Sequence, residues 1–307
     1  MKEYSKDDQI MVTIRCLTYN HEPYIRQCLD GFVMQKTNFR FEAIVHDDAS
    51  TDGTATIIKE YAEKYPDIIK PIFQKENQYS KHNGSISKIM NEYTHGKYIA
   101  LCEGDDYWID PLKLQKQIDF LEAHPEYSYS CHRYNILDDA TGSLTLCPNK
   151  YFDKYNKEKF FSFDIEYAFT QDWITKTLTG IYRRSAYLER NYKFYKYRRD
   201  LHLVYELLSK GKGICHSFIG GVFRKNNNST YNSLDTLRKK RIDYKVYKEF
   251  YRVNGDPLLK HIAVRIYLDL LLRHKTMVKV EDFSELAMII NTSVYFTMKK
   301  IRCKIFK

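Results

Sequence analysis

The sequence of 307 residues has no continuous apolar run of about 20 residues, the length that a helix needs to cross a bilayer. It also has no Cys-x-x-Cys pair, and its seven cysteines, an odd number, are scattered along the chain. This pattern argues against a disulfide framework and against a zinc site. The first nine residues are charged and contain no apolar core, so we expect no signal peptide and a reducing, cytoplasmic location.

A phosphate-binding loop of the form Gly-x-x-x-x-Gly-Lys-Ser/Thr is absent as well, which removes one large class of phosphotransferases. Charge is unbalanced, because 49 Lys and Arg face 39 Asp and Glu, for a net charge of +10. Such an excess is typical of nucleic-acid-binding proteins. However, acidic residues collect in loops of the first half, whereas the bases concentrate later in the chain. An acidic cleft disfavours nucleic acid as a partner.

The apolar run 98–101 leads into Cys-Glu-Gly-Asp-Asp, which ends at Asp105 and Asp106. This pattern indicates a buried strand that delivers two acids to one edge of a sheet. Neighbouring carboxylates repel each other unless a cation or strong donors neutralise them. Hard divalent metals suit such oxygen ligands, especially when substrate phosphates complete the coordination shell. The pair therefore predicts a metal site, with a solvated acidic turn as the alternative.

Two further predicted strands end in polar loops. Segment 41–46 is followed by a second Asp pair, Asp47 and Asp48, and the pattern of residues 55–65 then indicates a helix. The first strand, 11–17, leads into the loop 18–20. Because ligands bind at the carboxyl ends of strands in open α/β sheets, three polar loops at one edge predict a binding site.

These segments, taken in order, resemble the signature of family 2 glycosyltransferases, which are inverting enzymes with the GT-A fold. The similarity is strong over residues 10–135 and weak over residues 170–230. The segments that carry it are 17–20, 45–54 and 96–106. The resemblance implies an α/β fold with a Rossmann-like, mainly parallel sheet flanked by helices.

The resemblance also implies roles for individual residues. Asp48 would meet the edge of the uracil ring, and Asp105 the ribose or the donor sugar. Asp106, together with Asp105, would bind Mn²⁺ or Mg²⁺ that bridges the diphosphate, whose departure needs a Lewis acid. The residues implied to hold the nucleotide sugar are Leu17, Thr18, Tyr19, Asn20, Asp48, Asp105 and Arg224.

Arg224 is assigned through the segment 220–229, which resembles the family's aromatic-Arg-x-His element. Its planar guanidinium suits a diphosphate, although a basic solvated loop is an equal alternative. The chain departs from the family here, because Asn226 stands where His is often found. This departure weakens the prediction of a metal ligand in that segment.

Inversion needs a general base that deprotonates the acceptor hydroxyl. The family places it near the start of a later helix, which matches Asp200 before the helical pattern of residues 201–212. Asp200 suits the N-cap of that helix equally well. Asp172 is the main rival as base, and His202 is a lesser one, since an exposed position on the helix face is the commoner reading.

We predict a GT-A catalytic domain over residues 1–230, with a nucleotide-sugar half over 10–135 and an acceptor half over 136–230. A helical extension is expected over 231–307. Its tail, 294–307, combines aromatic, aliphatic and basic residues, and on a helix these would form an interfacial amphipathic surface. We therefore expect contact between the tail and the anionic inner face of the plasma membrane, with a terminal helix packed on the catalytic domain as the alternative.

The predicted function is the metal-dependent, inverting transfer of a sugar from a nucleotide sugar, in the first place a UDP sugar. The acceptor would be a growing surface polysaccharide or a lipid-linked glycan, an expectation that rests on the resemblance alone. Two alternatives from other classes stay open at this point: a metal-dependent nucleotidyl- or phosphotransferase, and a basic nucleic-acid-binding protein.

Overall fold

The computed structural model describes residues 9–155, 158–171, 174–188, 195–196, 199–225 and 235–274. Contacts between these residues define two compact units. The first contains residues 1–190 and 203–226, and the second contains residues 191–202 and 227–307. Asp172 and the tail 294–307 lie outside the described residues.

The strands are β1 (Val12–Thr18), β2 (Phe41–Asp47), β3 (Ile69–Phe73), β4 (Tyr98–Leu101), β5 (Tyr107–Trp108), β6 (Tyr127–Asp138), β7 (Ser143–Leu146), β8 (Phe160–Phe163), β9 (Ile181–Arg183) and β10 (Lys212–Lys225). The helices are α1 (Glu22–Val33), α2 (Thr54–Lys64), α3 (Ser85–Glu92), α4 (Lys113–Ala123), α5 (Lys150–Lys154), α6 (Ile165–Thr170), α7 (Arg184–Leu188), α8 (Asp200–Leu208), α9 (Thr236–Asn254) and α10 (Pro257–His274). Two short 3-10 turns lie at Tyr79–Lys81 and Thr177–Thr179.

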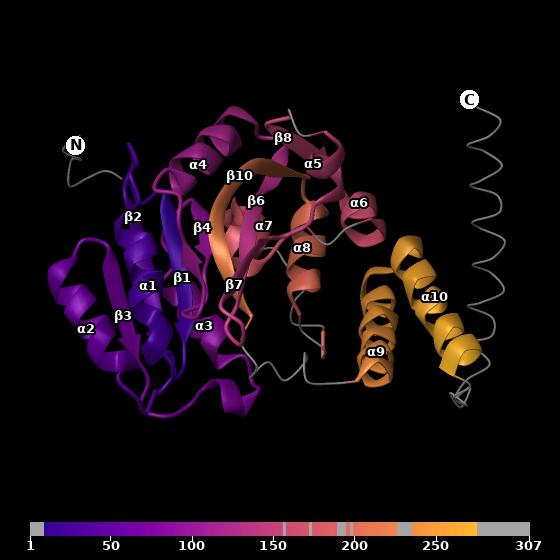
Figure 1. Cartoon of the computed structure of the whole chain (residues 1–307), viewed down its shortest axis with the longest axis horizontal. Helices are drawn as coiled ribbons and strands as arrows, with labels where there is room; N and C mark the ends of the chain where they lie inside the picture. Colours follow the sequence, from indigo (N-terminus) through magenta and orange to yellow (C-terminus); the bar gives the residue numbers. More distant parts are fainter. Residues whose placement is uncertain are drawn as a thin grey trace. The chain divides into compact units, whose positions relative to one another are not determined.

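The first four strands of the sheet are parallel and lie in the order β3-β2-β1-β4 (Figure 1). Thr18 at the end of β1 is in register with Asp47 at the end of β2. The predicted α/β fold is therefore confirmed, with the parallel arrangement concentrated in this half. The three polar loops that follow β1, β2 and β4 emerge at the same edge of the sheet.

The second half of the sheet adds mostly antiparallel pairs. Strand β9 is antiparallel to both β4 and β6, whereas β10 runs parallel to β6. The end of β10 pairs with β5, which follows directly after the Asp105–Asp106 loop. Between β6 and α6 the structure places β7, α5 and β8. β10 thereby brings Arg224 next to the acidic loop.

Helix α1 covers the sheet through an apolar face and has Pro23 in its first turn, a position that proline favours. Phe32 packs edge-to-face on Trp108, with ring centroids 5.0 Å apart. Gly31 permits this approach, since a Cβ atom there would lie 2.9 Å from the backbone nitrogen of Trp108. The contact fixes β5, and with it the end of the acidic loop, against α1.

Lys113 at the start of α4 is fully buried. Its Nζ atom donates to Oε1 of Gln117 at 2.9 Å and lies 4.1 Å from the centroid of the Trp108 ring. Burial disfavours the charged ammonium and lowers the pKa of Lys113 to about 7. The structure thus holds a lysine whose charge destabilises the fold at neutral pH.

We expect Lys113→Met to stabilise the protein, and more so at pH 6 than at pH 10. The unfolded lysine keeps its proton up to about pH 10.5, and the folded one only up to about pH 7. The cost of the buried charge to the free energy of unfolding is therefore complete below pH 7, shrinks as pH rises toward 10.5 and then vanishes. At about 1.4 kcal/mol per pKa unit it amounts to roughly 5 kcal/mol, less about 1 kcal/mol for the lost hydrogen bond to Gln117.

Thermal unfolding at the two pH values measures this effect. Lys116→Met is the matched control, because Lys116 is exposed on the same helix and pairs with Asp110 at 2.6 Å. An exposed ion pair contributes at most about 1 kcal/mol, so little change is expected there. An equal effect of Lys113→Met on stability at both pH values would contradict the prediction.

In the second unit, α9 and α10 pack against each other through an apolar cluster formed by Tyr244, Ala263, Tyr267 and Leu270. The helical pattern predicted for this part of the chain is confirmed for these two helices. No helix among the described residues is both long enough and apolar enough to cross a membrane.

Candidate active site

The loops after β1 and β2 are joined by hydrogen bonds. Asn20 donates its backbone N–H to Oγ of Ser50 at 2.9 Å, and its Oδ1 atom accepts from the backbone N–H of Thr51 at 2.8 Å. Asn20 has a positive φ of 54°, a conformation that asparagine tolerates better than most residues. Asn20 therefore holds the shape of the predicted nucleotide loop, in which Leu17 and Tyr19 are exposed.

Asp52 connects the first turns of two helices. One carboxylate oxygen accepts from the backbone N–H of Glu22 in α1 at 3.1 Å, and the other from that of Thr54 in α2 at 3.0 Å. Partial burial opposes its charge, but these bonds, with that from the Thr54 hydroxyl, hold the pKa of Asp52 below its usual value. Asp52 therefore holds the starts of α1 and α2 together.

Asp48 is buried and lies directly after β2, as predicted. Its backbone N–H donates to the carbonyl of Thr18 at 3.0 Å, which joins it to the end of β1. Its two carboxylate oxygens accept from the backbone N–H groups of Gln78 and Tyr79 at 2.7 and 2.9 Å. The carboxylate thus fixes the segment after β3, where the Tyr79 side chain is 71% exposed.

Sequence reasoning missed Gln78 and Tyr79. They hold Asp48 through backbone N–H groups, which every residue except proline possesses, so no sequence pattern marks them. The predicted contact of Asp48 with uracil stays a prediction. The structure adds the segment around Gln78 and Tyr79, which the sequence left unassigned, to the surroundings of Asp48.

Asp106 is only 2% exposed, and its Oδ1 atom accepts from the backbone N–H of Arg224 at 2.8 Å. Burial, followed by the negative charge of neighbouring Asp105, raises the pKa of Asp106 well above its usual value. The protein therefore concentrates negative charge here without compensating it fully.

The guanidinium of Arg224 contacts several protein groups. Its Nη1 and Nη2 atoms donate to Asp139 and Gln27 at 2.9 and 2.8 Å, and its Nε donates to the backbone carbonyl of Asp105 at 3.0 Å. The rings of Tyr24 and Tyr107 lie near it. These contacts tie the acidic loop to α1 and to the end of β6. The predicted contact of Arg224 with a diphosphate stays a prediction.

His21 is a second residue that the sequence reasoning missed, although it directly follows the predicted loop 18–20. Its Nδ1 atom is buried and has no hydrogen-bond partner among the described residues. A Cβ atom on Gly104 would lie 2.8 Å from it, so only glycine permits this contact. Burial lowers the pKa of His21, although three nearby carboxylates, Asp105, Asp52 and Asp47, oppose the shift.

The described residues contain no group of three or more His, Cys, Asp or Glu side chains that would hold a metal ion alone. Asp105 and Asp106 fit a divalent cation whose remaining ligands are water and substrate phosphates, the arrangement that Mg²⁺ favours. The raised pKa of Asp106 supports this fit, because a cation would supply the missing positive charge.

The candidate bases stand as follows. Asp200 is the first residue of α8, is exposed and belongs to the second unit, while Asp172 lies outside the described residues. The expected exposed position of His202 is wrong. Its ring is buried between Tyr195 and Phe250, with centroids 4.4 and 4.5 Å away, and burial lowers its pKa to about 4. His202 is therefore a packing residue.

The family model described as Glycosyl transferase family 2 matches residues 14–201. The chain belongs to this family. The matched region contains most of β1 and all of β2 and β4, with the polar loops that follow them, and therefore includes Asp48, Asp105 and Asp106. The predicted recognition and the enzyme class, a glycosyltransferase, are confirmed.

Relatives match part of this family 2 glycosyltransferase. An uncharacterised protein of Mycobacterium tuberculosis is 46% identical over 126 residues, which cover 41% of this chain and 36% of the relative. The putative glycosyltransferase EpsE of Bacillus subtilis is 39% identical over 109 residues, covering 36% and 37%. Escherichia coli WfaP, a UDP-Glc:alpha-D-GlcNAc-diphosphoundecaprenol beta-1,3-glucosyltransferase, is 31% identical over 129 residues, covering 42% and 48%. The matches thus span less than half of each relative.

Solved structures resemble the glycosyltransferase over more of its length. Staphylococcus aureus TarS 1-349 in complex with UDP-GlcNAc has a TM-score of 0.61 at 19% identity and covers 92% of this chain and 79% of that one. The mannosyltransferase PcManGT of Pyrobaculum calidifontis, in complex with GDP-Man and Mn²⁺, has a TM-score of 0.57 at 16% identity, covering 97% and 83%. At these identities the likeness shows the fold, which is GT-A.

Proposed function

We propose that this enzyme transfers a sugar from a UDP sugar, with inversion and with Mn²⁺ or Mg²⁺, to a growing surface polysaccharide or a lipid-linked glycan. The observation that carries the proposal is the buried carboxylate of Asp106 beside Asp105, at the same sheet edge as the loops after β1 and β2. A diphosphate would be repelled by these acids without a cation and attracted with one.

Each part of the site has a separate task. The loop 17–20 and the segment held by Asp48 would bind the nucleotide, while Asp105 orients the ribose or the donor sugar. Asp105 and Asp106 would hold the metal, which stabilises negative charge on the departing diphosphate. Arg224 keeps the acidic loop in place through its bonds to the Asp105 carbonyl and to Asp106.

Support for a UDP sugar comes from similar proteins. WfaP is named for UDP-Glc, and TarS was solved with UDP-GlcNAc. PcManGT, solved with GDP-Man and Mn²⁺, makes a guanosine donor the competing choice and supports the metal. The diphosphoundecaprenol-linked sugar in the name of WfaP supports a surface glycan acceptor. A lipid-linked acceptor would place the enzyme at the inner face of the plasma membrane, with no nucleic acid as partner.

Incubation with a panel of UDP, GDP, CDP and dTDP sugars and Mn²⁺ tests the proposal. We expect slow release of the nucleoside diphosphate from one class, in the first place UDP sugars, and none after addition of a chelator. Hydrolysis that continues with the chelator would refute metal dependence. A parallel incubation with nucleoside triphosphates tests the alternative, because a nucleotidyltransferase would release pyrophosphate from them.

Replacing Asp48 with alanine is expected to weaken binding of the nucleoside diphosphate more than it lowers turnover. The change removes both acceptors of the Gln78 and Tyr79 N–H groups, and each bond to a charged acceptor contributes about 1.5–3 kcal/mol. An affinity loss of roughly 10-fold or more follows, measured by titration calorimetry with UDP. Asp48→Asn, which keeps one acceptor oxygen, should lose less. Wild-type affinity in the alanine variant would show that Asp48 does not organise the nucleotide site.

A further inference from the structure

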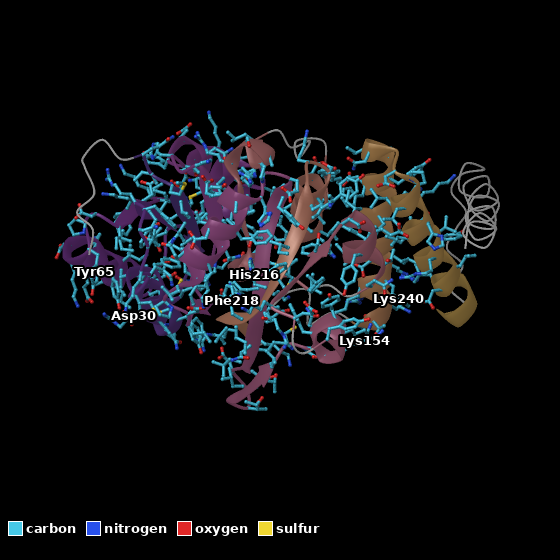
Figure 2. All side chains as sticks on the ribbon, turned by 90° about the horizontal axis from the view of Figure 1, so that it is seen from above. Asp30, Tyr65, Lys154, His216, Phe218 and Lys240 are labelled. Atoms are coloured by element: carbon cyan, nitrogen blue, oxygen red, sulfur yellow. The ribbon has the colours of Figure 1, made fainter. Side chains whose placement is uncertain are left out.

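The side chain of Arg224 joins three segments that are distant in the sequence. Arg224 lies near the end of β10, the strand whose residue His216 is labelled in Figure 2. Its guanidinium bonds to the backbone carbonyl of Asp105, to Gln27 of α1 and to Asp139, which directly follows β6. One side chain therefore connects the acidic loop, which carries both proposed metal ligands, to α1 and to the turn between β6 and β7.

Asp139 is an anionic partner of this guanidinium. Its Oδ1 atom accepts from Nη1 of Arg224 at 2.9 Å. The side chain of Arg224 is only 9% exposed, and that of Asp139 is 24% exposed. The guanidinium stays charged at every pH that the folded protein meets, and a charge that is this buried is costly unless it is paired. The ion pair with Asp139 therefore makes the position of Arg224 tolerable.

The side chain of Arg224 affects a metal site in two opposite ways. Its hydrogen bonds orient the acidic loop, which favours metal binding, whereas its positive charge repels a divalent cation held by Asp105 and Asp106. Asp139 offsets the repulsion, because the ion pair carries no net charge, and its bond also fixes the direction of the guanidinium. Replacing residues that orient metal ligands from behind typically lowers metal affinity or activity about 10- to 100-fold.

We propose that Asp139 is a positioning residue of the metal site. Acting through Arg224, it keeps the acidic loop in shape and leaves the negative charge of that loop available to a divalent cation. The inference rests on the proposed function for the presence of the metal. A purely structural role, in which Asp139 only anchors the β6–β7 hairpin, predicts a change in stability without a change in metal affinity.

Asp139→Asn tests the inference, because it removes the charge and leaves an oxygen that can accept the bond from Nη1. We expect the variant to bind Mn²⁺ in the presence of UDP about 10- to 100-fold more weakly than the wild type. Electron paramagnetic resonance of free Mn²⁺ measures this affinity on the full chain without any turnover. The Mn²⁺ concentration that gives half-maximal donor hydrolysis should rise by the same factor.

Asp138→Asn is the matched control. Asp138 precedes Asp139 in the chain, has a side chain that is 23% exposed, and pairs with Lys225 at 2.7 Å. The two carboxylates therefore agree in exposure, in charge and in the type of partner. However, the side chain of Lys225 is 53% exposed, so solvent screens its charge, and we expect Mn²⁺ affinity close to that of the wild type.

A second carboxylate next to the guanidinium should rescue the defect. Gln27 is exposed and its Oε1 atom accepts from Nη2 of Arg224 at 2.8 Å, so Gln27→Glu adds a negative charge beside that atom. In the double variant with Asp139→Asn, we expect most of the lost Mn²⁺ affinity to return. The gain should exceed the effect of Gln27→Glu alone, because only the double variant contains an unbalanced guanidinium to neutralise.

Three results would overturn the inference. Asp139→Asn binds Mn²⁺ as tightly as the wild type, even if it unfolds at a lower temperature, which would make Asp139 only an anchor of the hairpin. Asp138→Asn loses as much affinity as Asp139→Asn, which would assign the effect to net charge. The wild type binds no Mn²⁺ with UDP, which would refute the proposed metal dependence as well, whereas the first two results leave that function intact.

Discussion

Replacing Asp106 with asparagine is expected to abolish sugar transfer while the protein stays folded. The change removes one negative charge and almost no volume from the proposed metal site. A metal acting as a Lewis acid supplies several kcal/mol of stabilisation to the departing diphosphate, so a loss of about 1000-fold or more in turnover follows. The activity that remains should respond weakly to added Mn²⁺.

The fold should tolerate this change for a specific reason. The amide oxygen of asparagine can still accept the N–H of Arg224, which bonds to Oδ1 of Asp106 at 2.8 Å. Burial raises the pKa of Asp106, so above that pKa the ionised carboxylate destabilises the fold without a cation. In the absence of metal, Asp106→Asn should therefore unfold at the same temperature as the wild type or higher at neutral pH, and this gain should disappear in acid.

Glu103→Gln is the matched control, because it removes the same charge from an exposed residue of the same loop. Transfer measured across a range of Mn²⁺ concentrations should separate the two variants, with the control close to the wild type. Full activity and an unchanged metal response in Asp106→Asn would refute the metal assignment. A lower unfolding temperature together with lost activity would mean that Asp106 acts only through the fold.

The parts of this structure that could be predicted from the sequence depend on local signals. Helix α1 begins at Glu22, where Pro23 is a local signal for the first helical turn. Helix α2 was expected over 55–65 and spans Thr54–Lys64. The strands that end before Asp48 and Asp105 were recognisable because apolar runs stop at paired acids.

The contacts around those acids were not predictable in the same way. Arg224 reaches Gln27, a residue 197 positions earlier, and its arrangement depends on the pairing of β10 with β6 and β5. Asp48 bonds to backbone N–H groups, which carry no sequence signature. His202 was misjudged because its burial depends on Tyr195 and Phe250, two residues that lie outside the helix pattern that suggested exposure.

The second large effect is expected for the general base. If Asp200 deprotonates the acceptor, Asp200→Asn should lower transfer by roughly 100-fold or more, the usual scale of such catalysis. Donor binding, measured by calorimetry with UDP, should stay unchanged, because the base acts on the acceptor. The same two measurements on Asp172→Asn decide between the rival candidates.

Asparagine is the informative substitution, since it caps a helix about as well as aspartate does. A purely structural role of Asp200 at the start of α8 would therefore leave both stability and turnover nearly intact. Asp164→Asn is the control for capping, because Asp164 is the N-cap of α6 and accepts the Tyr167 N–H at 2.8 Å. If Asp200→Asn behaves like this control while Asp172→Asn loses transfer, the base is Asp172, and Asp200 only begins the helix.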